Sequence, residues 1–408
     1  MKFAVNAETL LDDVRAVSLA VNSKIVRALK NIRIRKEGAV LTLFGTCIDI
    51  EITRRHEHDI ATEGNFDLLV EPRPLMNILK AAKKAGDIAI VMEVETDLLT
   101  IWANGLTGCR KGCRKFTLRT MGGEDFPEMC KFGESQTSIS SVKLCQHFRR
   151  LRFAMGKEPQ RFTYNGCFAG VDGGRLEFAT TDSKRVSYIR TGVKCKSEDF
   201  GNVLLSETAL ATTQRLWKGK NEWLRLEFSA ERFSIRDEHT LFSSQLLFGD
   251  FPDYHRIIKE CDKSVSFQEA EMQIALEDVI DFVNPESRVV RFEVDGDRMR
   301  VSALNPDCGT AESFFPILEQ AGDFPAMNFD LTFIHAVLKI LKGDFIRLET
   351  TGAEMPGKFI LDDEWTYVVM PISRGETEDG IKTIPVSEEG EEITEEDLAV
   401  YVEMMCGY

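Results

Sequence analysis

The pattern Glu124-Asp125-Phe126-Pro127 recurs as Gly249-Asp250-Phe251-Pro252, with the two phenylalanines 125 positions apart. Each copy follows an alternating stretch that is typical of a β-strand, at residues 115–120 and 241–247. Because a proline ends strand pairing, each copy is interpreted as the end of a domain. Since this spacing is a common domain size, domain ends are expected at residues 127 and 252.

Two helices are expected in each third of the chain, from apolar spacing and from capping residues such as Pro72 and Ser206. They are expected at residues 7–20, 72–84, 140–155, 206–219, 274–284 and 330–343. Between them lie short alternating strands, and Asp295-Gly296-Asp297 predicts a hairpin between two of these. The sequence therefore predicts an α+β fold repeated three times, with two helices packed on antiparallel sheets in domains 1–127, 128–252 and 253–374.

The bulk composition of the 408-residue chain is that of a soluble globular protein, with 43% hydrophobic and 29% charged residues. No apolar run approaches the roughly 18 residues of a membrane span. The N-terminus lacks the form of a signal peptide. The ten cysteines include no Cys-x-x-Cys pair, which favours reduced thiols. A cytoplasmic location without a membrane partner is therefore expected.

The net charge of −15 is unevenly distributed. Residues 375–408 hold eleven acidic residues and one lysine, a net of −10, so the rest of the chain carries only −5. An acidic tail of this kind is expected to be solvated and disordered. The charge of the body must therefore be judged without the tail.

Catalytic and cofactor motifs are missing from the sequence. It contains no phosphate-binding loop, dinucleotide fingerprint, zinc-protease helix or nucleophile elbow, and Gly170-Val171-Asp172-Gly173-Gly174 is interpreted as a hairpin turn. Neither the pair Cys109 and Cys113 nor the pair His56 and His58 has the further ligands that a metal site needs. We therefore expect no enzyme activity, no cofactor and no metal, against the alternative of a nucleic-acid enzyme on a repeated scaffold.

Several motifs occur in order along the chain: Met1-Lys2-Phe3, then Arg161 to Gly166, Ala179 to Val186, Asp250 to Ile258 and Tyr367 to Ile372. This set resembles the bacterial DNA polymerase III beta subunit family, the sliding clamps, from residue 1 to about residue 374. The resemblance implies a head-to-tail homodimer that closes into a ring around double-stranded DNA, without reading its sequence.

The resemblance also implies the partners. A non-catalytic processivity factor of this kind tethers the replicative DNA polymerase, is placed on DNA by a clamp loader, and binds other proteins through clamp-binding peptides. The alternative is a clamp-like scaffold or decoy that binds partners without productive loading onto DNA.

Basic residues concentrate on four of the six expected helices, as a ring that attracts phosphates requires. The helix at residues 72–84 and the helix from residue 141 contain no acid, whereas the first helix and the one near residue 277 are acidic. Charge and resemblance together assign DNA contacts to Lys24, Arg73, Lys80, Lys83, Arg149, Arg150, Arg152, Phe162, Lys218 and Lys339.

The resemblance further implies a pocket for partner peptides between the second and third domains. Its expected residues are Tyr164, Thr181, Ser183, Lys184, Arg185, Val186, Pro252, Arg256, Ile257, Phe333, Val368, Val369, Met370, Pro371 and Ile372. Ser183-Lys184 replaces the usual Gly-His of the family, Tyr164 stands where Leu is common, and Phe333 replaces a Tyr. An altered peptide preference is therefore expected.

The dimer contact is also implied by the resemblance. Lys115, Phe116 and Leu118 are expected to meet Phe282 and residues 307–313 of the other copy. Residues 307–313 are poorer in acid than the family pattern. We therefore expect apolar contacts and edge-strand pairing to carry more of this interface.

Overall fold

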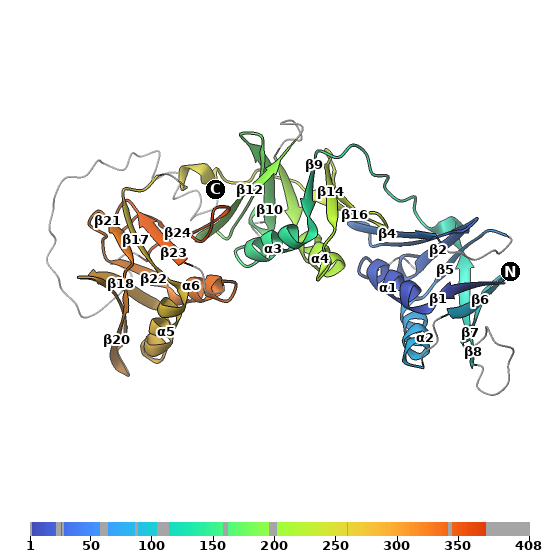
Figure 1. Ribbon diagram of the computed structural model, residues 1–408, viewed down its shortest axis with the longest axis horizontal. Coiled ribbons are helices and arrows are strands. Elements are labelled where there is room, and N and C mark those ends of the chain that lie inside the picture. Colours follow the sequence, from blue (N-terminus) through green and yellow to red (C-terminus); the bar gives the residue numbers. More distant parts are fainter. Residues whose placement is uncertain are drawn as a thin grey trace. The chain divides into compact units, whose positions relative to one another are not determined.

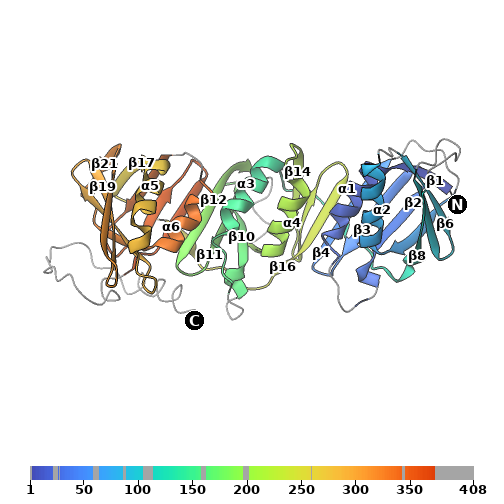
Figure 2. The ribbon, with the colours of Figure 1, turned by 90° about the horizontal axis from the view of Figure 1, so that it is seen from below.

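The computed structural model describes residues 2–21, 26, 28–57, 64–85, 89–103, 114–157, 162–195, 202–258, 260–341 and 345–372 (Figures 1 and 2). The chain divides into two compact units. Unit 1 contains residues 1–145 and 208–246, and unit 2 contains residues 146–207 and 247–408. The acidic tail, Cys109, Cys113, His58 and Lys24 lie outside the described residues.

Unit 1 is built on a continuous run of antiparallel strands. In spatial order these are β1 (Lys2–Asn6), β6 (Ala89–Glu95), β7 (Leu98–Ala103), β8 (Arg114–Gly122), β5 (Phe66–Val70), β2 (Ile32–Glu37), β3 (Val40–Thr46), β4 (Ile50–Glu57), β16 (Thr240–Leu247), β15 (Arg232–Arg236), β14 (Trp223–Phe228) and β9 (Thr137–Ser140). The strand β4 pairs with β16, which comes from the second repeat of the sequence. The first two repeats therefore share one sheet.

Helices α1 (Ala7–Ser18) and α2 (Pro72–Lys84) lie side by side in unit 1. The Asn6 side chain caps α1, accepting hydrogen bonds from the backbone N–H groups of Glu8 and Thr9 at 2.9 and 3.0 Å. Pro72 opens α2, where its missing N–H is not needed. Both helices bury one apolar face and leave the other to polar residues, as their periodicity predicts.

Unit 2 holds two antiparallel sheets. One contains β13 (Val203–Ser206), β10 (Gly166–Asp172), β11 (Arg175–Thr181), β12 (Arg185–Lys194), β25 (Trp365–Val369), β24 (Gly357–Ile360), β23 (Phe345–Thr350), β17 (Lys263–Gln268) and β21 (Glu319–Ala321). The other contains β22 (Met327–Asp330), β18 (Val289–Asp295), β19 (Arg298–Asn305) and β20 (Gly309–Pro316).

The remaining helices are α3 (Ser141–Arg152), α4 (Glu207–Trp217), α5 (Glu269–Val279) and α6 (Leu331–Leu338). Short 3-10 turns lie at Ala28–Lys30, Gly123–Asp125, Phe162–Asn165, Tyr254–Arg256 and Ile280–Phe282. Helices α3 and α4 both begin on one side of the boundary between the two units and end on the other.

The α+β fold class with antiparallel sheets is confirmed, and so are the predicted hairpins. Gly173, Gly174 and Gly296 have φ values of 54°, 75° and 63°, the left-handed conformation that such turns require. Only α2 has the predicted bounds. Helices α1, α3 and α4 differ from the prediction by one to three residues at an end, and α5 and α6 differ by more. Helix α5 begins at Glu269 rather than at residue 274, because Met272 and Leu276 already belong to its buried face, and α6 ends at Leu338. The division into three domains stays a prediction.

A buried ion pair joins α1 to the shared sheet of unit 1. The Asp13 carboxylate, which is 1% exposed, accepts from Arg54 Nε at 2.8 Å and lies 2.9 Å from His56 Nε2. Arg54 also donates to the Thr240 hydroxyl on β16. A buried carboxylate is tolerated because it has such partners, so Arg54 links both repeats through one side chain.

We expect Arg54→Ala to lower the free energy of unfolding by about 3–5 kcal/mol, because it leaves the buried Asp13 carboxylate without its cation. Denaturant unfolding of the full-length chain measures the loss. Arg55→Ala is the matched control, since Arg55 is exposed on the same strand and should change stability by no more than about 0.5 kcal/mol. Equal stability of the two variants would contradict a structural role for the pair.

Candidate functional sites: a peptide pocket and charged helix faces

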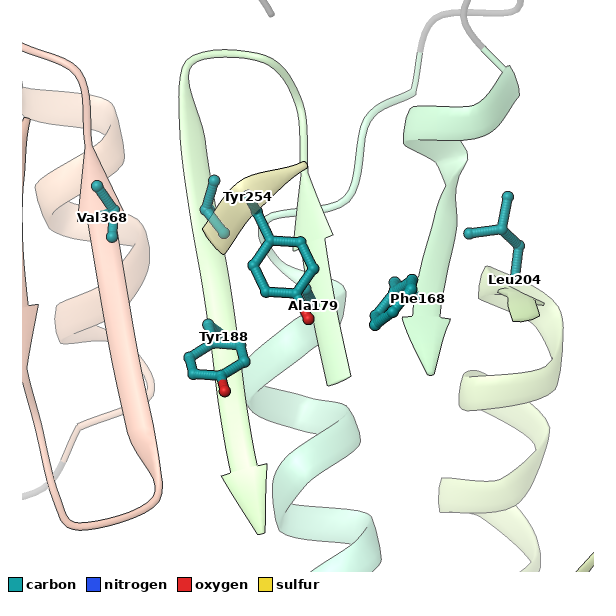
Figure 3. Close-up of a cluster of buried hydrophobic side chains, with 7 residues drawn as sticks. Phe168, Ala179, Tyr188, Leu204, Tyr254 and Val368 are labelled. Atoms are coloured by element: carbon teal, nitrogen blue, oxygen red, sulfur yellow. The ribbon is translucent and has the colours of Figure 1, made fainter. Parts of the chain in front are cut away.

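An apolar cluster in unit 2 gathers side chains from several strands and from the connector that follows β16 (Figure 3). Val186 on β12, Val368 on β25 and Tyr254 in the connector are 2%, 1% and 2% exposed. Half-buried Ile257 and Ile258 pack against this cluster and are still partly open to solvent. The surface here is therefore apolar, with a buried floor and a partly open wall.

Strand pairing between β12 and β25 brings the distant motifs together. Arg185 lies opposite Val369, and Val186 lies opposite Val368. Beyond the last pair, the Met370 N–H donates to the Lys184 carbonyl at 2.9 Å, and the Ile372 N–H donates to the Asn328 carbonyl at 2.9 Å. Residues 368–372 are thus held against the loop before β12.

The loop from Thr181 to Arg185 is fixed by its own hydrogen bonds. The Thr181 hydroxyl donates to the Arg185 carbonyl at 2.7 Å and accepts from the Ser183 N–H at 3.1 Å. Ser183 has a φ of 77°, a strained value for a residue with a side chain. A glycine would be free of that strain, and the hydrogen bonds of Thr181 hold Ser183 in this conformation.

Arg185 joins both sides of the site. Its guanidinium pairs with Asp182 at 2.8 Å, donates to the Phe153 carbonyl at 2.8 Å, and lies 4.7 Å from the ring centre of Phe333. Burial lowers the pKa of Arg185, but the neighbouring Tyr367 and Asp182 raise it by more. The pKa therefore lies above its ordinary value, and the guanidinium stays charged. The ring of Phe333 thus makes a cation–π contact with the Arg185 guanidinium.

The structure brings the predicted pocket residues into one unit and shows how accessible each is. Lys184 and Arg256 are exposed at the rim, and Arg256 pairs with Asp253 at 3.1 Å. The half-buried members are Arg185, Pro252, Ile257, Phe333, Met370, Pro371 and Ile372, and the buried ones are Tyr164, Thr181, Ser183, Val186, Val368 and Val369. The buried members form the floor, and only the half-buried and exposed members present surface to solvent.

A buried hydrogen-bonded carboxylate that no sequence motif indicated packs against the connector. Glu177 on β11 accepts from the hydroxyls of Tyr188 and Tyr254, both at 2.8 Å. Burial and the neighbouring Glu177 charge raise the pKa of both tyrosines, so both hydroxyls stay protonated donors. Tyr254 stands within the quoted Asp250–Ile258 motif, which was the available signal for it.

The predicted DNA contacts occupy exposed positions on several helices. Arg73 and Lys80 are exposed on α2, Arg149 on α3, Lys218 just beyond α4, and Lys339 at the end of α6. Two others are exposed or half-buried but already paired, Lys83 with Glu8 and Arg152 with Glu207. Phe162 begins a 3-10 turn, and its side chain lies outside the described residues.

Arg150 departs from the expected DNA contact. Its side chain is 10% exposed, pairs with Asp362 at 2.6 Å, and stacks 4.5 Å from the ring centre of Trp365. Residues 149 and 150 point to different sides of α3, and charge counting along the helix cannot distinguish them. Arg150 therefore takes part in the packing of unit 2, where Asp362 already pairs with its charge.

The predicted dimer residues lie on strand β8 of unit 1 and in the turn after α5 of unit 2. Lys115, Phe116 and Leu118 are on β8, which pairs with β7 along Arg114–Arg119; no other strand of the described chain pairs along that stretch. Phe282 is half-buried in the 3-10 turn that follows α5. Helix α5 packs on β20. Within the described residues β20 pairs only with β19, so each unit presents an open strand edge.

Comparison with known proteins gives the family. The model of the N-terminal domain of the DNA polymerase III beta subunit matches residues 1–130, and the model of its central domain matches residues 138–253. Together these matches cover more than half of the sequence. The chain belongs to the DNA polymerase III beta-subunit family.

Individual relatives agree over nearly the whole length. The beta sliding clamp of Pseudomonas aeruginosa is 26% identical over 377 residues, which cover 91% of this chain and 100% of that protein. The beta sliding clamp of Rickettsia bellii is 26% identical over 393 residues, with 91% and 99% covered. The crystal structure of the DNA polymerase III subunit beta from Pseudomonas aeruginosa superposes with a TM-score of 0.81 at 25% identity, covering 91% of this chain and 100% of that one.

The function is therefore that of a DNA sliding clamp, a non-catalytic processivity factor in DNA replication that binds DNA and DNA polymerase. The alternative of a decoy is not favoured. No group of three or more potential metal ligands occurs among the described residues, and no described helix is long and apolar enough to span a membrane.

We expect Arg150→Ala to lower the free energy of unfolding by about 1–3 kcal/mol, because it removes the partner of Asp362 and the cation over Trp365. Arg149→Ala is the matched control, since its side chain is exposed one position earlier. Thermal unfolding of the full-length chain compares the two. An unchanged midpoint for Arg150→Ala would contradict the packing role.

Proposed function

We propose that this sliding clamp works as a homodimeric ring, loaded by a clamp loader, that recruits partners by binding their peptides in the pocket around Val186 and Val368. The observation that carries this proposal is the joining of the Ala179–Val186, Asp250–Ile258 and Tyr367–Ile372 motifs around one partly open apolar cluster. The replicative polymerase and the clamp loader would use the same pocket. The proposed location of the protein is the cytoplasm, where bacterial DNA is replicated.

The chemistry of the pocket suits an extended peptide with apolar anchors. Ile257, Ile258 and Met370 offer apolar surface that is half-buried and accessible. Lys184 and Arg256 supply charge at the rim. An apolar slot with a polar rim fixes the anchors by burial and the orientation by hydrogen bonds.

DNA binding in this proposal rests on the exposed cations of α2, α3 and α6. Lys80, Arg149 and Lys339 are exposed, and each long side chain can reach a phosphate without reading a base. Such contacts release counterions and depend strongly on salt. Contacts that carry no sequence information permit the ring to slide.

Dimer formation would pair the open edges of β8 and β20. Arg114, Lys115 and Arg119 place positive charge along β8. Beside β20, the exposed residues Glu277 and Asp278 on α5 supply negative charge. Helix α5 thus adds to the few acidic residues of the 307–313 segment. Opposite charges on the two edges favour this pairing over pairing of like edges.

We expect the combined variant Lys80→Glu, Arg149→Glu and Lys339→Glu to weaken retention on DNA. The slope of log affinity against log salt should fall by about one for each lost phosphate contact. Lys131→Glu, Arg175→Glu and Arg225→Glu together give the same change in net charge on exposed positions outside these helices. Equal salt slopes for the two triple variants would remove these helices from the DNA contact.

We expect Met370→Asp to weaken binding of a labelled Gln-Leu-x-Leu-Phe peptide by about 30-fold or more, because a charge would replace an apolar contact in the slot. Arg190→Ala is the control, since Arg190 lies on β12 beyond the pocket and pairs with Asp172 at the surface. Fluorescence anisotropy measures the affinity, and the mass in solution shows whether the oligomer persists. Wild-type affinity of the Met370 variant would place the peptide site elsewhere.

A further inference from the structure

We propose that Glu177 is a positioning residue for partner binding: its buried carboxylate holds Tyr254, and through Tyr254 it sets the wall of the peptide pocket. This inference rests on the proposed peptide pocket. Glu177 is 2% exposed and accepts a hydrogen bond on each carboxylate oxygen, from Tyr188 on Oε2 and from Tyr254 on Oε1. Tyr254 is part of the buried floor of the pocket, and neither it nor Glu177 presents an open surface to a peptide.

The connector that contains Tyr254 is short of regular structure. Residues 251–258 follow β16 and hold only the three-residue 3-10 turn Tyr254–Arg256. The pocket residues Pro252, Arg256 and Ile257 lie within three positions of Tyr254. Any shift of Tyr254 must therefore move pocket residues on both sides of it.

The connector is attached to the sheet by an aromatic group around Tyr254. The Tyr254 ring lies near those of Phe168 and Tyr188 (Figure 3), at 5.4 and 5.5 Å between ring centres. The Phe251 ring lies 5.6 Å from that of Phe168. These contacts are apolar and tolerate sliding, since aromatic pairs accept a range of offsets. The hydrogen bond from the Tyr254 hydroxyl to Glu177 supplies the directional contact that selects one position.

The carboxylate is a strong anchor because of where it lies. A hydrogen bond to a charged acceptor is stronger than one between neutral groups, and burial removes the competing water. His255 Nε2 lies 3.4 Å from the same Oε1 and stacks on Tyr254 at 4.4 Å between ring centres. Two consecutive connector residues thus face one oxygen of Glu177, while Tyr188 on β12 occupies the other oxygen.

This division of the two oxygens supplies a matched pair of variants. Tyr254→Phe removes the hydroxyl that holds the connector, and Tyr188→Phe removes an equivalent hydroxyl that links only β12 to β11. Both changes leave the ring in place and remove one donor from the same buried carboxylate. A purely structural role of the carboxylate predicts the same effect for both.

The test measures binding of the labelled Gln-Leu-x-Leu-Phe peptide, thermal unfolding and DNA retention for the full-length variants. We expect both substitutions to lower the unfolding midpoint similarly and to leave DNA retention unchanged. Peptide binding should weaken about tenfold in Tyr254→Phe, the loss of one such hydrogen bond, and stay within about twofold of wild type in Tyr188→Phe. Equal peptide affinities in the two variants would overturn the inference.

A double-mutant cycle adds a second measurement. If Glu177 acts through Tyr254, Glu177→Gln combined with Tyr254→Phe should bind the peptide no more weakly than the weaker single variant. Independent, additive losses of peptide affinity would overturn the inference. If the Glu177 variant fails to fold, the comparison of peptide affinity between Tyr254→Phe and Tyr188→Phe still decides. Met370→Asp separates the two proposals. If Met370→Asp loses peptide binding while Tyr254→Phe binds the peptide with wild-type affinity, the pocket is retained and the positioning role is rejected.

Discussion

The backbone pairing of β12 with β25 is the interaction on which the partner site depends. It runs from Arg185 opposite Val369 to Ile189 opposite Trp365, and it joins strands from the second and third repeats into one sheet. Because side chains alternate along a strand, a slip of one residue in either strand would turn its own valine, Val186 on β12 or Val368 on β25, away from the cluster. The register therefore determines both the floor of the pocket and the position of the Met370 segment, and neither repeat could form the pocket alone.

Local signals in the sequence were sufficient for most of the fold. Capping residues, helical periodicity and Asp-Gly or Gly-Gly turns act over a few residues, so α2 and the β18–β19 hairpin were predicted at or near their observed bounds. The start of α5 was missed because its first buried residue is Glu269, a charged side chain that a search for apolar periodicity does not count. The peptide pocket was predicted from family motifs, since periodicity cannot show that two strands about 180 residues apart become neighbours.

The roles that the sequence could not indicate belong to charged residues whose partners are distant in the chain. Arg149 and Arg150 are adjacent and chemically identical, yet one is exposed and the other pairs with Asp362, which lies in the third repeat. Glu177 sits in an apolar strand, where a carboxylate looks misplaced until Tyr188 and Tyr254 are seen to donate to it. Buried charges are retained only with such partners, so their positions report long-range contacts that local patterns do not contain.

The same pairing of charges limits how tightly the proposed ring could hold DNA. Lys83 and Arg152 share their charge with Glu8 and Glu207, and Arg150 is withdrawn into the packing of unit 2. Outside residues 375–408 the chain still carries a net charge of −5, so attraction to phosphate depends on exposed helix cations such as Lys80. A small number of salt-sensitive contacts gives weak local affinity. In such a protein, retention on DNA must come mainly from closure of the ring, which lets the contacts break and re-form as the clamp moves.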